Sequence, residues 1–347
     1  MPEAYPVISG MGRHVGGAEL QSWIIAKELA EDPKFKVYFI VRAFEDGTEI
    51  IDNVIVFKIN YKEPTIGYLK ILKAMVKINA DVYYQRTGGV ATIFVSFFCK
   101  IFKKRFIFHV SRDEQLDNGY PYNKSTIIKK LYRISINLAD FIIVQNKIQK
   151  KKVLYKKSFI IPNAIEDVEI DKTSKKEDFI LWVATITDLK RPELFIELAK
   201  KIPKYNFIMI GGTSNKNLYK KIKSNEKKLK NIKIIGFKPL KEVEEYFKRA
   251  KIFINTSILE GFPNTFLQAW KYGTPVVSLD IDPDEIICKY KLGFHSKSFE
   301  KMVKDVERLY EDIKLYKKIS IRCRRFILKF DVKRLISKYK EILLIDV

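Results

Sequence analysis

Short apolar runs alternate with stretches of helical periodicity along nearly the whole chain, and this alternation constrains the fold more than any other feature. In the first half, runs typical of buried strands occupy residues 36–41, 54–59, 81–85, 105–110 and 140–146, and helical patterns occupy 18–31, 68–78 and 125–139. In the second half, a helical pattern follows each strand-like run, at 178–184, 206–212, 231–237, 251–256 and 274–279. Such alternation gives parallel sheets with helices on both faces. Two series therefore predict an α/β chain with two Rossmann-like, doubly wound domains.

The length of 347 residues also fits about two domains. A polar, aperiodic stretch near residues 161–178, which opens with Pro-Asn, separates the two series. We therefore expect an N-terminal domain over residues 1–163 and a C-terminal domain over residues 164–347. The second domain ends in a helical tail from about Phe299, whose last helix could cross back to the first domain.

The start of the first series departs from the usual pattern. A doubly wound domain begins with an apolar strand, and its ligand-binding loop follows that strand. Here Gly16 and Gly17 have only the short run PVIS ahead of them. We expect the N-terminal sheet to lack its central first strand, residues 5–9 not to supply it, and the natural start of the protein to lie upstream of Met1.

The formal net charge of +24 attracts polyanions in general, such as nucleic acid, an anionic membrane surface or phosphate-bearing substrates. Between Lys100 and Lys157, fifteen residues are basic and four are acidic. This concentration is equally typical of solvated lysine-rich helix faces and of a patch that meets an anionic surface.

The three cysteines, Cys99, Cys288 and Cys323, are far apart and form no C-x-x-C motif, which favours reduced thiols in a cytoplasmic protein. The longest apolar run, at residues 90–98, is too short to span a membrane. We expect the helix over residues 90–105 to be buried against the sheet, with its lysine-rich end free to meet anionic lipid.

The most specific signal is TSILEGFPNTFLQAWKYGTPVVSLD at residues 256–280. A strand ends near Thr256, and a turn leads to Pro263, which suits the first position of a helix. The free amides at the start of that helix, those of Asn264, Thr265 and Phe266, would cradle a diphosphate. The Glu260 carboxylate before the cradle can hold sugar hydroxyls, and the Gln268 amide further along the helix can hold a ribose.

These residues resemble glycosyltransferase family 4, also called glycosyl transferases group 1, whose members have the GT-B fold. The family's donor-site signature, E-G-F-x5-E-A followed by G-x-P-V-V, is matched by Glu260-Gly261-Phe262, Gln268-Ala269 and residues 273–277. The family's N-terminal G-G-A-E is matched at residues 16–19, and its second-domain opening resembles residues 181–199 with Lys190 at the phosphate-binding lysine.

The resemblance implies a retaining transfer from a nucleotide-sugar donor, held between the two domains, to a lipid-linked or saccharide acceptor on the acceptor-side N-terminal domain. It implies that Gly16 and Gly17 approach the diphosphate and sugar and that Lys190 neutralises the leaving phosphate. It also implies that Glu260 holds the sugar and that His109 lies beside it. The remaining donor contacts it implies are Gly236 and Phe237 at the base, Gly261, Phe262, Pro263, Asn264 and Thr265 at the turn, and Gln268 at the ribose.

Two departures from the family pattern bear on this site. The second glutamate of the signature is Gln268 here, which keeps hydrogen bonding but drops a charge. The family often has arginine in a G-R pair ahead of the phosphate-binding lysine, where this chain has Ala184-Thr185. Neutralisation of the phosphate should therefore depend more heavily on Lys190.

Weaker signals concern the acceptor and metal ions. His14, Arg86 and Arg112 lie where loops of the first domain would face the acceptor. Asp280-Ile281-Asp282 is similar to the D-x-D metal motif, but its place after the last core strand favours a turn and helix cap. We expect no metal and no cofactor besides the donor itself.

Two other functions remain open from the sequence. A nucleotide-sugar epimerase of the same fold would use the same donor without an acceptor. A basic nucleic-acid-binding protein would account for the charge, although we expect no nucleic-acid partner. The preferred interpretation is a cytoplasmic glycosyltransferase of glycoconjugate or cell-envelope polysaccharide biosynthesis, peripheral at the inner face of the membrane.

Overall fold

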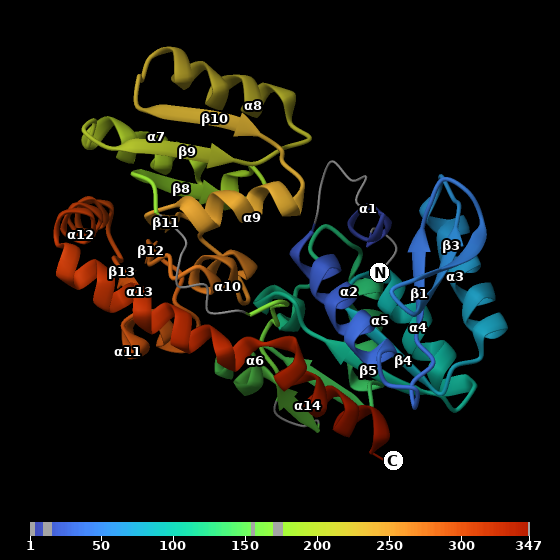
Figure 1. Cartoon of the computed structure of the whole chain (residues 1–347). Coiled ribbons are helices and arrows are strands. Elements are labelled where there is room, and N and C mark those ends of the chain that lie inside the picture. The colour runs from blue at the N-terminus through green and yellow to red at the C-terminus, as the bar shows by residue number, and fades with distance from the viewer. Residues whose placement is uncertain (1–3, 10–15, 154–156, 169–175, 346–347) are drawn as a thin grey trace. The chain divides into compact units, whose positions relative to one another are not determined.

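The structure is a computed structural model that describes residues 4–9, 16–153, 157–168 and 176–345. The chain divides into two compact units. Unit 1 comprises residues 1–166 and 332–347, and unit 2 comprises residues 167–331. Figure 1 shows that each unit is built from sheets and helices that alternate along the chain.

The described residues of unit 2 form a single sheet of six strands in the order β10-β9-β8-β11-β12-β13, and every neighbouring pair is parallel. The two central strands read FILWV and IFIN and are buried almost throughout, as expected for strands covered on both faces. The strands are β8 (Phe179–Val183), β9 (Asn206–Ile210), β10 (Ile232–Gly236), β11 (Ile252–Asn255), β12 (Val276–Ser278) and β13 (Gly293–His295).

Amphipathic helices connect these strands and bury their apolar residues. In α7, for example, Phe195, Ile196, Leu198 and Ala199 are buried and the lysines are not. The helices of unit 2 are α7 (Pro192–Lys201), α8 (Lys216–Lys223), α9 (Leu240–Arg249), α10 (Asn264–Lys271), α11 (Ile286–Tyr290), α12 (Phe299–Glu311) and α13 (Ile313–Ile327).

In the part of unit 1 that the structure describes, the strands form two separate sheets, where one sheet is normal for a doubly wound domain. The first has the order β1-β3-β2, from β1 (Tyr38–Arg42), β2 (Gly47–Ile51) and β3 (Val54–Ile59). The second has the order β4-β5-β6-β7, and all its pairs are parallel, from β4 (Val82–Arg86), β5 (Arg105–His109), β6 (Phe141–Val144) and β7 (Ser158–Ile160).

Helices from both ends of the chain cover the sheets of unit 1. The last helix, α14 (Val332–Leu344), packs against α2 (Gly17–Ala30) and adds Ile336, Tyr339 and Ile342 to a shared core with β5 and β6. The remaining helices are α1 (Tyr5–Ile8), α3 (Pro64–Ile78), α4 (Val90–Ile101), α5 (Thr126–Asn137) and α6 (Lys147–Lys152).

The structure has a strand at each of the ten places that the sequence indicates. Most strand boundaries differ from the expected ones by one or two residues. Three short strands were not predicted, namely β2, β7 and β13. Strand β2 also breaks the expected parallel pattern, because it forms an antiparallel hairpin with β3 through Asp52 and Asn53. As expected, residues 5–9 give no strand, because residues 5–8 form α1.

Helix α4 departs in part from the burial expected for it. Phe98 and Cys99 are buried against the sheet, but Phe94, Ile101 and Phe102 remain exposed. All three cysteines of the chain are free thiols, as expected. Across the residues that the structure describes, no helix is both long and apolar enough to cross a bilayer.

Candidate active site

The candidate active site lies at the carboxyl ends of β8 and β11, the two central strands of unit 2. The chain continues from β8 to β9 on one side, whereas β11 and then β12 lie on the other side of β8. This reversal of strand order is a topological switch point, where open α/β sheets bind their ligands. The loops that meet there are residues 184–191 after β8 and residues 256–263 after β11.

Lys190 and Glu260, one from each loop, are in direct contact. The Lys190 ammonium donates a hydrogen bond to Glu260 Oε1, and the Ser257 hydroxyl donates to the same oxygen at 2.9 Å. The exposed fractions of the two side chains are 23% for Lys190 and 19% for Glu260. The ion pair is therefore half-buried, and a ligand from solvent can still reach both charges.

The two loops are fixed to each other by hydrogen bonds around Thr256. Its hydroxyl donates to the Lys190 carbonyl at 2.6 Å and accepts from the Trp182 indole at 2.9 Å. The Ile258 amide also donates to the Leu189 carbonyl at 2.9 Å. Because Trp182 and Thr256 are buried, this network holds the backbone of Lys190 in place from the core of the sheet.

Helix α10 begins beside these two loops, and its first residue lies one position later in the sequence than expected. Pro263 is its N-cap and Asn264 is its first residue. The Phe266 amide donates to the Pro263 carbonyl at 3.1 Å, so the predicted cradle of three free amides is narrower than expected. Gly261 and Phe262 are buried in the preceding turn. The half-exposed residues of the helix include Asn264, Thr265 and Gln268, whose spacing places them on one face.

In unit 1, His109 and Arg86 end two neighbouring strands, and both side chains are fully buried. His109 Nδ1 lies 2.6 Å from the Tyr84 hydroxyl and 3.4 Å from an Arg86 guanidinium nitrogen. Arg86 also donates to Asn163 Oδ1. Burial, with the Arg86 charge as a second cause, lowers the pKa of His109 well below its ordinary value, so the imidazole is neutral.

The other residues expected in unit 1 lie on its surface. Gly16 is the N-cap of α2, Gly17 is its first residue, and both are exposed. A Cβ at Gly16 would overlap the Glu19 carboxylate, which folds over that position. Arg112 is half exposed, 3.6 Å from Glu114, whereas His14 lies outside the described residues.

Comparisons with known proteins show which family the chain resembles. Residues 164–326 match the model of the family described as glycosyl transferases group 1. The uncharacterized glycosyltransferase MJ1059 of Methanocaldococcus jannaschii is 25% identical over 83% of this chain and 87% of its own. The capsular polysaccharide biosynthesis glycosyltransferase CapH of Staphylococcus aureus is 26% identical over 85% of each chain. A crystal structure of Anabaena Alr3699/HepE in complex with UDP-glucose has a TM-score of 0.71 at 15% identity and covers 96% of this chain and 97% of that chain.

Residues 164–326 are a group 1 glycosyltransferase domain. The chain has the GT-B fold that the resemblance implies. Glycosyltransferase activity is supported by the family match and by both relatives. The Lys190–Glu260 pair lies within the matched residues, at the switch point of this domain.

Arg191 is a residue of the group 1 domain that the sequence analysis did not single out. Its backbone is left-handed, with φ of 46°, and its Nε donates to the Thr256 carbonyl at 2.6 Å. Its guanidinium also forms an ion pair with Asp280. A second cation therefore follows Lys190 directly, although Thr185 supplies none. The adjacent Lys-Arg pair was the only sequence signal for it.

The D-x-D-like residues of the group 1 domain have structural partners. Asp280 pairs with Arg191, while the Asp282 carboxylate accepts from the amides of Ile287 at 2.7 Å and Cys288 at 3.2 Å. Asp282 thus caps the turn into α11, as the sequence predicts. Potential ligand atoms of Asp282, Cys288 and His295 lie within 4.8 Å of one another.

Gly236 is the last residue of β10 and Phe237 follows it, at the same carboxyl edge of the sheet as the two central loops. Gly236 has φ of 88°, a conformation that favours glycine, and its carbonyl accepts from the Gly211 amide at 2.9 Å. This geometry fixes the start of the loop that the resemblance assigns to the base.

Proposed function

We propose that this glycosyltransferase moves a sugar from a nucleotide-sugar donor to a lipid-linked or saccharide acceptor, with retention of anomeric configuration. The observation that supports the proposal is the half-buried Lys190–Glu260 pair beside the start of α10, at the switch point of the group 1 domain. The name of CapH supports a saccharide acceptor by similarity.

In the proposed mechanism, the bound donor separates Lys190 from Glu260 and takes the place of their ion pair. The diphosphate takes the Lys190 ammonium and the first amides of α10, and a sugar hydroxyl takes the Glu260 carboxylate. As the bond from the anomeric carbon to the phosphate oxygen breaks, negative charge grows on the leaving diphosphate. Lys190 and the positive end of α10 stabilise that charge. The acceptor hydroxyl attacks the anomeric carbon and passes its proton to the departing phosphate.

The other expected residues have proposed roles around this centre. Gly236 and Phe237 border the base, and Gln268 holds the ribose from the half-exposed face of α10. Gly16 and Gly17 approach the diphosphate and sugar. Neutral His109 is proposed beside the transferred sugar. The residues proposed on the acceptor side are Arg86, Arg112 and His14.

Product analysis tests the proposed function. The protein is incubated with nucleotide sugars and a mixture of lipid-linked and saccharide acceptors, and products are separated by mass. We expect free nucleoside diphosphate and a glycosylated acceptor in equal amounts, and NMR should show the donor's anomeric configuration. An epimerised nucleotide sugar with no acceptor consumed would instead assign the epimerase reaction, and an inverted linkage would contradict retention.

Activity should persist after metal removal. Lys190 and the amides of α10 can carry the phosphate charge, while Asp280 and Asp282 already have partners within the protein. We expect a sample treated with EDTA and desalted to transfer sugar at the rate of the untreated sample. Activity that is lost, and that returns only with Mg²⁺ or Mn²⁺, would make these aspartates ligand candidates again.

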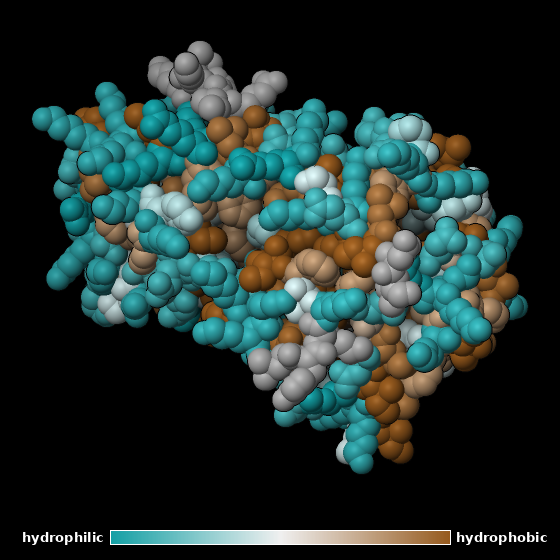
Figure 2. Space-filling view, turned by 90° about the horizontal axis from the view of Figure 1, so that it is seen from below, coloured by the Kyte–Doolittle hydropathy of each residue, from teal (hydrophilic) through white to brown (hydrophobic). Residues whose placement is uncertain are grey.

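We further propose peripheral binding to anionic membranes through α4, its C-cap residue Phe102 and the adjacent helix α5. These neighbouring helices carry exposed apolar side chains at Ile101, Phe102, Ile127 and Ile134 among exposed basic residues. Figure 2 shows apolar side chains that reach a mostly hydrophilic surface. Basic side chains attract anionic lipid while apolar ones enter the interface.

Vesicle co-sedimentation tests this surface. Each Lys or Arg near an anionic bilayer contributes about 1 kcal/mol at low salt. Reversing the charges of Lys130 and Arg133 on α5 should therefore weaken binding strongly, and high salt should do the same. The matched control reverses Lys220 and Lys221 on α8, with the same change in net charge. Equal loss in both variants, or equal binding to neutral vesicles, would contradict the assignment.

A further inference from the structure

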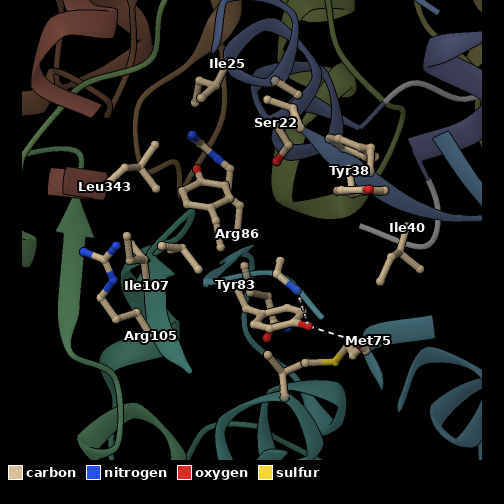
Figure 3. Close-up of a pocket in the computed structure, with 18 of the residues that line it drawn as sticks. Ser22, Ile25, Tyr38, Ile40, Met75, Tyr83, Arg86, Arg105, Ile107 and Leu343 are labelled. Carbon is tan, nitrogen blue, oxygen red and sulfur yellow. Dashed lines mark hydrogen bonds between the residues drawn. The ribbon is translucent and has the colours of Figure 1, made fainter. Parts of the chain in front are cut away.

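Unit 1 contains a cavity of about 840 Å³ that lies outside the proposed donor contacts. Figure 3 shows its walls, where the Tyr83 hydroxyl donates a hydrogen bond to the Met75 carbonyl at 2.8 Å. Most of the lining is apolar, and the lining residues that the structure describes include neither cysteine nor histidine. The cavity therefore offers neither a thiol nor an imidazole to a metal ion, whereas unit 2 brings both together with a carboxylate.

Asp282, Cys288 and His295 form this group at the carboxyl ends of β12 and β13. Asp282 follows β12, Cys288 lies in α11, and His295 is the last residue of β13. Because β12 and β13 are parallel neighbours, their carboxyl ends meet at the same edge of the sheet. Each of the three residues offers one ligand atom, and these atoms lie within 4.8 Å of one another. We call the three residues the Asp-Cys-His cluster.

The backbone positions the Asp-Cys-His cluster from both sides. The Ser296 amide donates to the Ser278 carbonyl at 2.8 Å, which ties the end of β13 to the end of β12. The turn that leads into α11 contains two non-glycine residues with left-handed backbone, Asp284 with φ of 53° and Glu285 with φ of 57°. Such conformations persist only where the surrounding structure enforces them. The fold therefore determines where the three side chains meet.

The Asp282 carboxylate is the buried member of the cluster, because only 1% of its side chain is exposed. It accepts hydrogen bonds from the amides of Ile287 at 2.7 Å and Cys288 at 3.2 Å. Burial, and then a hydrogen bond to Asp282, raises the pKa of the Cys288 thiol, so the sulfur is in contact with the carboxylate. A carboxylate has about four acceptor positions, so the two amides leave room for a cation in place of the thiol proton.

The distance between His295 and Asp282 fits a shared cation. His295 Nδ1 lies 3.9 Å from Asp282 Oδ2, which is too long for a hydrogen bond. A zinc–nitrogen and a zinc–oxygen bond together span roughly 4 Å. A tetrahedral zinc ion separates its ligand atoms by roughly 3.3–3.8 Å, so the cluster closes by about 1.5 Å at most. Cys288 is exposed, and its side chain can therefore turn toward the other two ligands without disturbing the core.

The types of ligand indicate which cation fits. Mg²⁺ and Ca²⁺ bind oxygen ligands, whereas thiolate and imidazole ligands suit zinc. Three protein ligands with a fourth position for water are a common zinc arrangement. The carboxylate and the thiolate together supply two negative charges, which balance a divalent cation.

We propose that the Asp-Cys-His cluster binds one Zn²⁺ ion through a carboxylate oxygen of Asp282, Sγ of Cys288 and Nδ1 of His295, with water as the fourth ligand. The thiol releases its proton to solvent when the ion binds. The ion acts structurally, because it joins the turn after β12 to the end of β13. None of its ligands is a proposed donor contact, so sugar transfer is still expected after EDTA treatment.

Metal titration tests the proposal. The protein is treated with EDTA, desalted and titrated with Zn²⁺ in competition with a chromogenic chelator. We expect one Zn²⁺ per chain. His295→Asn and Cys288→Ser should each weaken binding about a hundredfold, since loss of even an outer-shell partner lowers metal affinity roughly 10- to 100-fold. Co²⁺ in place of Zn²⁺ should give a thiolate-to-cobalt charge-transfer band that Cys288→Ser lacks.

The matched control is Glu285→Gln, which removes a carboxylate from the same turn but outside the cluster. We expect the control to bind Zn²⁺ like the parent. We also expect Zn²⁺ to raise the melting temperature of the parent and of the control, but not that of the two ligand variants. A measurement without any substitution is alkylation by iodoacetamide, which Zn²⁺ should slow at Cys288. Peptide mass analysis distinguishes Cys288 from the buried Cys99 and Cys323.

Three results would overturn the proposal. An exposed thiol can bind Zn²⁺ alone, and His295→Asn keeps that thiol, so undiminished binding by this variant would show that the cluster is not the site. Equal weakening in Glu285→Gln would assign the binding to general negative charge. Alkylation of Cys288 at the same rate with and without Zn²⁺ would show that the sulfur is not a ligand.

Discussion

Replacing Lys190 with alanine is expected to lower the rate of sugar transfer by about a hundredfold or more, because loss of one preorganised group at a developing charge typically has that effect. Lys190 is held by the Thr256 hydroxyl and pairs with Glu260 before the donor binds. Without its ammonium, the leaving diphosphate would keep only the amides of α10 among the proposed contacts. We also expect the nucleoside diphosphate product to inhibit the variant more weakly, since it has lost the same contact.

The matched control for this variant is Lys200→Ala on α7. Lys200 forms an ion pair with Glu197 at 2.9 Å, and both side chains are exposed. The Lys200→Ala substitution therefore also removes a lysine–glutamate ion pair. Initial rates with saturating donor compare the two variants. Near-native turnover by Lys190→Ala would remove Lys190 from the active site, and an equal loss in Lys200→Ala would assign the effect to charge or stability.

Replacing Glu260 with glutamine is expected to reduce kcat/KM for the donor by a similar factor, through the sugar rather than the phosphate. The carboxylate accepts hydrogen bonds from Lys190 and Ser257, and the proposed donor sugar would take the place of the lysine. Glutamine keeps the size but loses the charge, so its hydrogen bonds to sugar hydroxyls are weaker. Inhibition by the nucleoside diphosphate should therefore change little, which separates this variant from Lys190→Ala.

Glu197→Gln is the control for the second variant, because it changes the partner of Lys200 in the same exposed pair. The melting temperature of Glu197→Gln should agree with that of the parent, since the Glu197–Lys200 pair is exposed and such pairs contribute little to stability. The proposed role of Glu260 fails if Glu260→Gln binds and transfers sugar as well as Glu197→Gln does.

Much of the fold follows from apolar runs that are long enough to be distinct. The run IFIN in β11 and the run FIIV in β6 are short and almost continuously apolar, which is typical of interior strands, and the structure buries every position of both. Strands β7 and β13 have three residues each, too few for a period to be recognised. Strand β2 had a signal in Asp52-Asn53, where both residues adopt positive φ as the tight hairpin requires.

The candidate site could be predicted where chemistry follows from position along the chain. Glu260 follows a buried strand and precedes a helix, so its place at the carboxyl edge was evident from the order of elements. How deeply a site residue is buried could not be predicted in this way. The placement of Arg86 and His109 at strand ends is confirmed, but the sequence carries no sign that Asn163 and Tyr84 enclose them. The role of Arg191 could not be predicted either, because its hydrogen bond to the Thr256 carbonyl joins two residues that are 65 positions apart in the sequence.

The most direct test of donor binding in the group 1 domain is a thermal-shift screen against a panel of nucleotide sugars. It compares the parent protein with the Lys190→Ala and Lys200→Ala variants. A ligand at a hundred times its Kd stabilises a protein by about 2.7 kcal/mol, which a melting curve detects. We predict that at least one nucleotide sugar raises the melting temperature of the parent and of Lys200→Ala, with a much smaller shift in Lys190→Ala. A panel that shifts none of the three, or that shifts all three equally, would contradict a donor site at Lys190.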